Sequence, residues 1–200
     1  MKTKLWSIQQ IDKLEEINST GRLVCMANTF SKEWDNEYRW MATQMMNRIG
    51  QPENKDQYPI WAWYQYRDSI KMKPDLRGSG FLPTGTKGIR IEFEKDKDEL
   101  LLSDFELWHF PLSYKSYIPE NETEMNRFED KLKEQSLDKT EFKHLPTKIK
   151  EQIEKSWQKI FDMDFEDEYS TSKMIDKRIQ ACCWEIKSEE ILNIQKFTAR

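Results

Sequence analysis

The sequence predicts an α+β fold in a single domain over residues 1–200, with a mixed or antiparallel sheet and flanking helices. A chain of 200 residues can bury a sizeable core. Eight Trp, ten Phe and seven Tyr supply large apolar side chains, although 34% of the residues are charged. Short segments that alternate between apolar and polar residues are interleaved with segments of helical spacing, so both strands and helices are expected.

The first fifty residues predict two strands, each followed by a helix. A strand over residues 4–8 precedes a helix that ends at Gly21, a residue suited to a C-terminal cap. A second strand over residues 22–26 precedes a helix that ends at Gly50. The second helix carries an apolar stripe, for which core packing is the favoured interpretation: Trp34, Tyr38, Met41, Met45 and Ile49.

The middle of the chain predicts three strands and one long loop. Residues 59–66 are rich in β-favouring aromatics and predict a buried strand. Proline and glycine interrupt residues 74–85, which form either a loop that closes over a ligand or an ordinary connection. Residues 89–94 alternate strictly and predict a half-exposed strand. Residues 100–104 predict a strand that ends at an aspartate suited to cap a helix or turn.

The last third of the chain predicts two amphipathic helices and two strands. Helical spacing covers residues 125–135 and 146–161. Residues 162–168 hold five acidic side chains, and a solvated loop is favoured over a metal site because no ordered ligand spacing is present. Residues 178–186 and 193–197 predict the final strands.

Charge and cysteine content limit the function classes. The net charge of -4 argues against binding DNA through bulk positive charge, although a local basic groove stays open. Of three cysteines, Cys182 and Cys183 are adjacent, which does not suit a disulfide framework. We therefore expect a reducing, cytoplasmic setting. No segment reaches the roughly 20 apolar residues that a membrane helix needs, and the N-terminus does not resemble a signal peptide.

Five aromatic rings gather within residues 58–66, directly before a segment that holds cationic and carboxylate side chains. Aromatic faces next to guanidinium groups suit flat, charged ligands such as nucleotides or nucleic-acid bases. Arg67, Asp75 and Arg77 can clamp an anionic group or form an internal salt-bridge network. This segment is the predicted ligand site.

The remaining polar candidates lie later in the chain. His109 follows a strand end in an aromatic neighbourhood, and a hydrogen-bonded structural histidine is favoured over a catalytic one. Cys182 and Cys183 are expected to be buried and unreactive. Glu185 next to Trp184 is either a surface glutamate or, if that face lines a cleft, an acid, base or ribose-binding carboxylate.

Several segments together resemble the bacterial family called Domain of Unknown Function 3841, over nearly the whole chain. They are Lys4-Leu5-Trp6-Ser7-Ile8-Gln9, Pro59-Ile60-Trp61-Ala62-Trp63-Tyr64-Gln65, Lys73-Pro74-Asp75-Leu76-Arg77, Leu101-Leu102-Ser103-Asp104-Phe105-Glu106-Leu107-Trp108-His109 and Ile179-Gln180-Ala181. The resemblance supports one continuous domain and implies no particular activity.

The order of elements also resembles ADP-ribosyltransferases of the DNA-targeting toxin type, which cleave the nicotinamide bond of NAD. That resemblance places Trp6 as a stacking aromatic and Arg67 near the NAD phosphates. Ser7 stands where those enzymes commonly carry histidine, and Cys182 where they carry glutamate. A thiol gives little support to an oxocarbenium-like charge, so Glu185 would have to substitute.

Two hypotheses follow from the sequence. In the first, an ADP-ribosyltransferase-like domain binds NAD or a related nucleotide, with Glu185 as the candidate catalytic residue. In the second, the same surface is a non-catalytic module for a nucleotide, single-stranded nucleic acid or a protein. The candidate ligand-binding residues are Trp6, Gln9, Trp61, Trp63, Tyr64, Tyr66, Arg67, Asp75, Arg77, Ser103, Asp104, His109 and Gln180. No metal site is expected, and the cofactor, substrate and oligomeric state stay open, as does the question of whether the chain is an enzyme.

Overall fold

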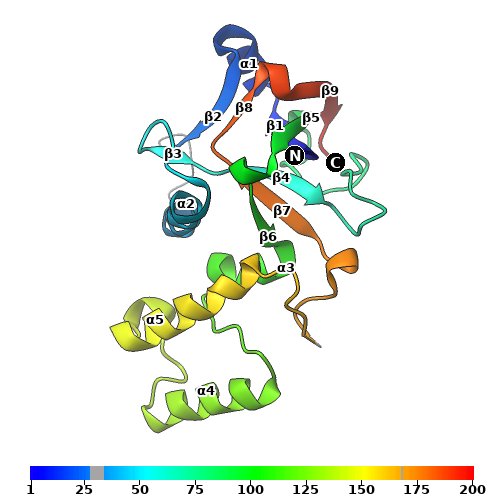
Figure 1. Ribbon diagram of the computed structural model, residues 1–200. Helices are drawn as coiled ribbons and strands as arrows, with labels where there is room; N and C mark the ends of the chain where they lie inside the picture. Colours follow the sequence, from blue (N-terminus) through cyan, green and yellow to red (C-terminus); the bar gives the residue numbers. More distant parts are fainter. Residues whose placement is uncertain (28–33, 168) are drawn as a thin grey trace. The chain divides into compact units, whose positions relative to one another are not determined.

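The computed structural model describes residues 1–27, 34–167 and 169–200 and has the predicted α+β fold (Figure 1). The chain divides into two compact units. We call residues 1–102 with 178–200 the sheet unit, and residues 103–177 the helical unit. Each unit is described by itself below.

The sheet unit carries most of the strands and two helices. In chain order its elements are β1 (Lys2–Gln10), α1 (Lys13–Thr20), β2 (Arg22–Met26), α2 (Asp35–Ile49), β3 (Gln57–Tyr58), β4 (Ile60–Gln65), β5 (Lys87–Asp96), η3 (Lys97–Glu99), β7 (Ile179–Cys183), β8 (Glu185–Lys187), η8 (Ser188–Glu190) and β9 (Ile191–Thr198). Strand β6 (Leu101–Asp104) begins in this unit and ends at the first residues of the helical unit.

The described residues form two sheets. The larger has the strand order β6-β7-β4-β1-β5-β9, and the smaller has the order β3-β2-β8. The β1–β4, β1–β5, β4–β7 and β5–β9 pairs are antiparallel. In this register Trp63 of β4 lies opposite both Trp6 of β1 and Gln180 of β7. Three candidate residues from distant parts of the chain therefore share one row of the large sheet.

The core of the sheet unit lies on one face of the large sheet. Side chains alternate along each strand, so every second residue faces this core. Residues from β1, β4, β5 and β7 contribute, together with α1 and the small sheet: Leu5, Ile17, Leu23, Ile60, Ala62, Ile89, Ile91, Phe93, Leu100, Ala181, Cys183 and Ile186. Gly21 ends α1 at φ 76°, and its N–H donates to the Ile17 carbonyl, as the predicted cap requires.

The opposite face of β5 is more covered than the sequence predicts. Arg90 was expected to be exposed, but only 7% of it is accessible. Its guanidinium donates to the carbonyl of Pro74 in the loop between β4 and β5 and to the Gln195 side chain on β9. Alternation identified the face correctly, but a long loop folds back over part of that face.

The predicted strand over residues 178–186 is interrupted at Trp184. Its first part, β7, pairs with β4 in the large sheet, and its second part, β8, pairs with β2 in the small sheet. The chain therefore changes sheets at Trp184. Periodicity alone did not reveal the break because apolar residues continue through it.

The helical unit consists of helices and short turns. Its elements are α3 (Phe105–His109), η4 (Phe110–Tyr114), α4 (Glu122–Glu134), η5 (Phe142–His144), α5 (Thr147–Ser156), η6 (Trp157–Phe161) and η7 (Met174–Asp176). The helix predicted over residues 146–161 is α5 followed by η6, and its apolar residues at helical spacing are buried: Ile149, Ile153, Trp157 and Ile160. Of the predicted acidic loop, residue 168 lies outside the described residues. In the described ranges, no helix combines the length and apolar character needed to cross a bilayer.

Candidate functional site

A polar pocket of about 200 Å³ lies in the sheet unit. Its lining combines one indole, three carboxylates and one ammonium group with amide and aliphatic side chains: Ile49, Gln51, Glu53, Gln57, Lys95, Glu99, Trp184 and Glu185. We call it the Trp184 pocket. Pockets that enclose a drug-sized ligand are usually about 300–1,000 Å³, so this one holds only part of such a molecule.

The break between β7 and β8 places Trp184 at this pocket. Its indole N–H donates to the Gly50 carbonyl at 2.9 Å, where α2 ends. The Gln57 side chain donates to the Trp184 carbonyl at 3.3 Å, and its own oxygen accepts from the Asn54 N–H at 2.7 Å. The two contacts with Trp184 attach the end of α2 and β3 to the residue before β8, and the contact between Asn54 and Gln57 holds the intervening loop against β3.

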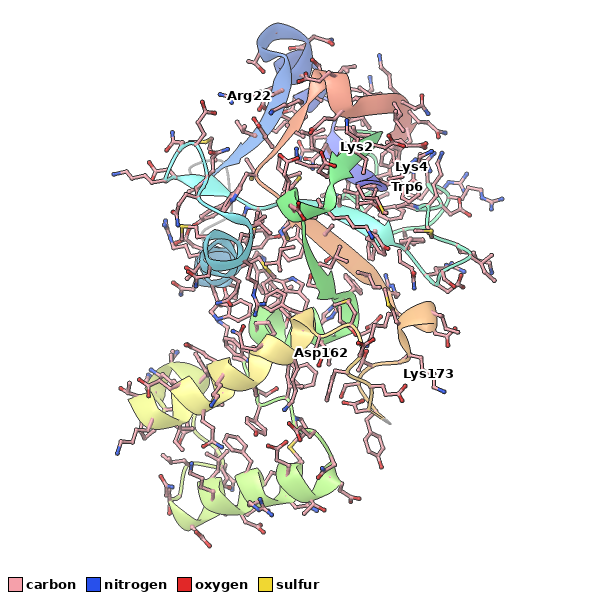
Figure 2. All side chains as sticks on the ribbon, in the orientation of Figure 1. Lys2, Lys4, Trp6, Arg22, Asp162 and Lys173 are labelled. Carbon is pink, nitrogen blue, oxygen red and sulfur yellow. The ribbon has the colours of Figure 1, made fainter. Side chains whose placement is uncertain are left out.

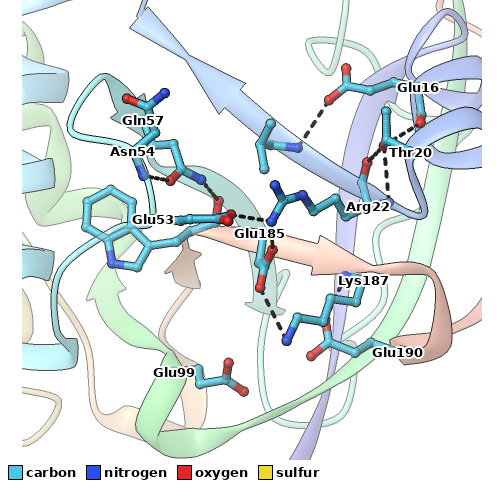
Figure 3. Close-up of polar contacts among 12 residues, drawn as sticks. Glu16, Thr20, Arg22, Glu53, Asn54, Gln57, Glu99, Glu185, Lys187 and Glu190 are labelled. Atoms are coloured by element: carbon cyan, nitrogen blue, oxygen red, sulfur yellow. Dashed lines mark hydrogen bonds and ion pairs between the residues drawn. The ribbon is translucent and has the colours of Figure 1, made fainter.

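Glu185 is held between two cations on the small sheet (Figure 3). Its Oε2 lies 3.2 Å from Nη1 of Arg22, and its Oε1 lies 3.4 Å from Nζ of Lys187. The same Nη1 of Arg22 also donates to Glu53, on the loop that precedes β3. Arg22 therefore joins two of the carboxylates that line the pocket.

Lys95 is the buried cation of the pocket. Its ammonium lies 2.8 Å and 2.9 Å from the two oxygens of Glu190 and 3.6 Å from Glu99, while only 2% of the side chain is exposed. Burial lowers the pKa of Lys95, but the hydrogen bond and attraction to Glu190 outweigh it, so the net pKa lies above the usual value. Lys95 is therefore charged at neutral pH.

The arrangement suits a flat polar ligand better than a metal ion or a phosphate inside the pocket. The lining itself holds three carboxylates and one lysine, and Glu190 neutralises that lysine, while Arg22 and Lys187, which pair with Glu53 and Glu185, are not part of the lining. Carboxylates accept hydrogen bonds from hydroxyl and amine groups and repel anions. In the described part of the chain, no group of three or more His, Cys, Asp or Glu side chains is arranged to hold a metal.

The predicted aromatic segment forms a separate cluster. Trp6 and Trp63 are only 6% and 8% exposed. The Trp63 ring meets the edge of Tyr66 at 5.0 Å, and the Arg178 guanidinium lies 5.4 Å from the Trp63 centroid and 5.9 Å from that of Tyr66. Arg178 also donates to the Tyr66 carbonyl. None of these four residues is in the lining of the Trp184 pocket.

Trp6 also contacts a cluster of charged side chains, of which Figure 2 labels Lys4 beside Trp6. Its indole N–H donates to Glu92 at 3.0 Å, and the ammonium groups of Lys73 and Lys4 lie 2.9 Å and 3.3 Å from that carboxylate. The hydrogen bond from Lys73, then that from Trp6, lowers the pKa of Glu92 to about 2. Lys73 thereby attaches the loop between β4 and β5 to the sheet.

The other aromatic candidates pack inside the sheet unit. Trp61 meets the edge of Tyr38 on α2, with ring centroids 5.9 Å apart. Tyr64 packs against the hydrophobic core. Ser7 is fully buried and donates to the Trp61 carbonyl at 2.8 Å, while the Gln9 amide donates to the Ser7 hydroxyl at 2.8 Å. Ser7, which stands where the resembled ADP-ribosyltransferases commonly carry a histidine, thus bridges β1 and β4.

The candidate anion clamp lies on the loop between β4 and β5. Arg77 is 80% exposed and binds Asp75 through Nε at 3.0 Å and Nη2 at 2.6 Å. This hydrogen bonding holds the pKa of the Asp75 carboxyl well below its usual range. Arg67 is exposed, and its guanidinium lies 6.0 Å from the Tyr66 ring. Arg77 and Asp75 therefore pair with each other, while Arg67 lies against the aromatic cluster.

Three candidates belong to the helical unit. Asp104 is fully buried, caps α3 through the N–H groups of Glu106 and Leu107, and binds Lys177 at 2.9 Å. His109 donates from Nδ1 to the Phe105 carbonyl at 3.0 Å. The buried Ser103 hydroxyl has no hydrogen-bond partner among the described residues.

The adjacent cysteines are buried in β7. Cys182 and Cys183 are 0% and 1% exposed. Burial raises the pKa of both thiols, that of Cys183 to about 12. These thiols are protonated at neutral pH, which agrees with the interpretation as unreactive cysteines.

Of the residues at this pocket, the sequence singled out Glu185 next to Trp184 but did not single out Arg22, Glu53 or Lys95. One signal was present for Lys95, because the alternation that buries Ile89, Ile91 and Phe93 continues to position 95. A lysine at a core-facing position requires a carboxylate partner. Arg22 and Glu53 carried no such signal, since their contact depends on how a loop folds over the small sheet.

A family model matches the chain over residues 4–192, and its description is Domain of unknown function (DUF3841). No curated protein and no solved structure matches the chain significantly. The family match spans both the sheet unit and the helical unit. On this match, which covers nearly all of its length, the chain belongs to the DUF3841 family.

Proposed function

We propose that this protein binds NAD or a related nucleotide, with the base or nicotinamide end in the Trp184 pocket. The observation that carries the proposal is that Trp184 and Glu185 line the same pocket. An indole face can stack on a heterocyclic ring, and a carboxylate can accept hydrogen bonds from ribose hydroxyls. The pocket volume of about 200 Å³ suits one end of a nucleotide.

The charges favour binding over cleavage of the glycosidic bond. Stabilising an oxocarbenium-like charge calls for a carboxylate whose negative charge is available to the substrate. Both oxygens of Glu185 are already paired, with Arg22 and Lys187. The aromatic cluster around Trp63, and Trp6 opposite it on β1, supply no wall of this pocket. We therefore favour a nucleotide-binding module over an ADP-ribosyltransferase. We also favour it over a protein that binds nucleic acid through the phosphate backbone.

Calorimetry tests the binding proposal. NAD, ADP-ribose, adenosine, nicotinamide riboside and a short single-stranded oligonucleotide are titrated into the whole protein. We expect saturable binding of at least one nucleoside or nucleotide and none of the oligonucleotide. Trp184→Leu should weaken binding by about 1–3 kcal/mol, the usual value of one base-stacking contact, while Trp184→Phe should retain most of the affinity. Binding that is unaffected by Trp184→Leu would exclude this pocket.

A nicotinamide-release assay separates the module from an enzyme. We expect no release from NAD by the wild type or by Glu185→Gln. Glu134→Gln, an exposed position in the helical unit, is the charge-matched control. Release by the wild type that is lost in Glu185→Gln and kept in Glu134→Gln would establish the ADP-ribosyltransferase-like alternative.

A further inference from the structure

Arg22 is the cation beside the Trp184 pocket with hydrogen-bonding capacity to spare. A guanidinium has five N–H donors. Its contacts with Glu53 and Glu185 both use Nη1, and Nε and Nη2 have no hydrogen-bond partner among the residues that the structure describes. The Arg22 side chain is 41% exposed, so an anion in solvent can reach this residue.

The other two cations near the pocket are less suited to an incoming anion. Lys95 is only 2% exposed and binds both oxygens of Glu190. Lys187 is a point charge that pairs with Glu185. A guanidinium matches the geometry of phosphate through two parallel N–H groups, which an ammonium cannot do.

Glu53 is a carboxylate that ligand binding can displace. Its side chain is 68% exposed and lies on the loop between α2 and β3. Exposed ion pairs contribute only about 0–1 kcal/mol. The two ends of this loop are attached to Trp184 through Gly50 and Gln57, so losing the Glu53 contact leaves that attachment intact.

We propose that Arg22 binds the phosphate of the bound nucleotide and that Glu53 competes with this phosphate for the same guanidinium. The inference rests on the proposed function. The pocket accommodates the uncharged or cationic end of the ligand, and its three carboxylates keep phosphate outside, next to Arg22. Glu53 then acts as an internal anion that weakens the binding of phosphorylated ligands, because their phosphate binds Arg22 fully only when Glu53 moves away.

The experiment compares ligands that differ by one phosphate. Calorimetry gives the affinity ratio of AMP to adenosine, and of nicotinamide mononucleotide to nicotinamide riboside, for each variant. In the wild type the phosphorylated member should bind more tightly. Glu53→Gln should raise that ratio about two- to fivefold, which corresponds to the strength of an exposed ion pair. Arg22→Gln should reduce the ratio to about one, and Glu134→Gln should leave it unchanged.

The outcomes separate this inference from the proposed function. If nucleosides bind but the ratio does not rise in Glu53→Gln, or does not fall in Arg22→Gln, the competition is refuted and the pocket assignment stands. If no nucleoside or nucleotide binds the wild type, both fail. Circular dichroism spectra and unfolding midpoints of each variant establish that a change in the ratio does not come from misfolding.

Discussion

The ammonium of Lys95 lies between the two oxygens of Glu190, at 2.8 Å and 2.9 Å, although 95 positions separate these residues in the chain. Lys95 belongs to β5, and Glu190 ends the short η8 turn between β8 and β9. The ion pair therefore attaches that turn to the C-terminal end of β5 in the large sheet.

Lys95→Met should lower the free energy of unfolding by about 3 kcal/mol, because removing one partner of a buried pair leaves a charge without compensation. Glu190 is 11% exposed, so water can relieve only part of this cost. Urea denaturation measures the loss. Lys97→Met, at an exposed position on η3, is the matched control and should change stability by less than about 0.5 kcal/mol.

The same pair predicts how stability depends on alkaline pH. The pKa of Lys95 is raised in the folded protein, so its contribution is fully present below the unfolded value of 10.5 and is lost as the pH rises through the folded value. The stability difference between wild type and Lys95→Met should therefore shrink above about pH 10.5. A difference that stays constant across that range would argue against a charged Lys95.

Glu92 should control acid stability in the opposite sense. Its pKa is lowered from 4.5 to about 2, first by Lys73 and then by Trp6, so its contribution is present above pH 4.5 and is lost as the pH falls through about 2. Glu92→Gln should lower the free energy of unfolding by only about 1–2 kcal/mol at pH 7, because the two lysines are half exposed. Near pH 2 the cost should be much smaller, because Glu92 is then largely protonated in the wild type as well. Urea titrations at several pH values measure this trend, and an equal cost at both ends would contradict it.

Asp104→Ala should destabilise the helical unit by about 3–5 kcal/mol. The substitution removes the cap of α3 and leaves the buried ammonium of Lys177 without its carboxylate. Asp104→Asn keeps a capping oxygen and should cost less. Asp130→Ala, at an exposed position on α4, is the control. Thermal unfolding measures the stability of both variants. If Asp104→Ala lowers the unfolding temperature no more than Asp130→Ala does, Asp104 does not stabilise the helical unit in this way.

Gly88→Ala should destabilise the sheet unit by about 1–3 kcal/mol through overpacking. A Cβ at position 88 would lie 2.6 Å from Leu82 and 2.7 Å from the Phe197 ring. The glycine therefore allows the β4–β5 loop and β9 to approach β5. Ser79→Ala, at an exposed loop position, should be neutral, and chemical denaturation compares the two variants.

Arg77→Ala tests the clamp that the sequence predicts on the β4–β5 loop. If Arg77 binds an anionic ligand, the substitution should weaken that ligand by about 1–3 kcal/mol. Because the Arg77–Asp75 pair is exposed, stability should change by less than about 0.5 kcal/mol. Calorimetry with AMP and ADP-ribose on this variant and on Arg22→Gln shows which arginine the phosphate contacts, and unchanged affinity in Arg77→Ala would remove Arg77 from the site.

Local patterns were enough to determine most of the secondary structure. Gly21 and Gly50 end their helices because glycine adopts the positive φ found at both positions. Strict alternation from Ile89 to Phe93 gave the correct core face of β5. The adjacent cysteines were expected to be buried, and both are. Each of these features can be predicted from the residue types within a short segment of the chain.

The site needed the tertiary structure because its residues meet only through long-range pairing. The sequence marked Trp184 and Glu185, but the change of sheet at Trp184 places them beside Lys95 and the loop that carries Glu53. The sequence also placed the β4 aromatics and Arg77 in one predicted ligand site. In the structure Trp63 packs against Arg178, and Arg77 pairs with Asp75. Hydrophobic periodicity specifies which face of a strand is buried, but it does not specify which strand, loop or charge that face meets.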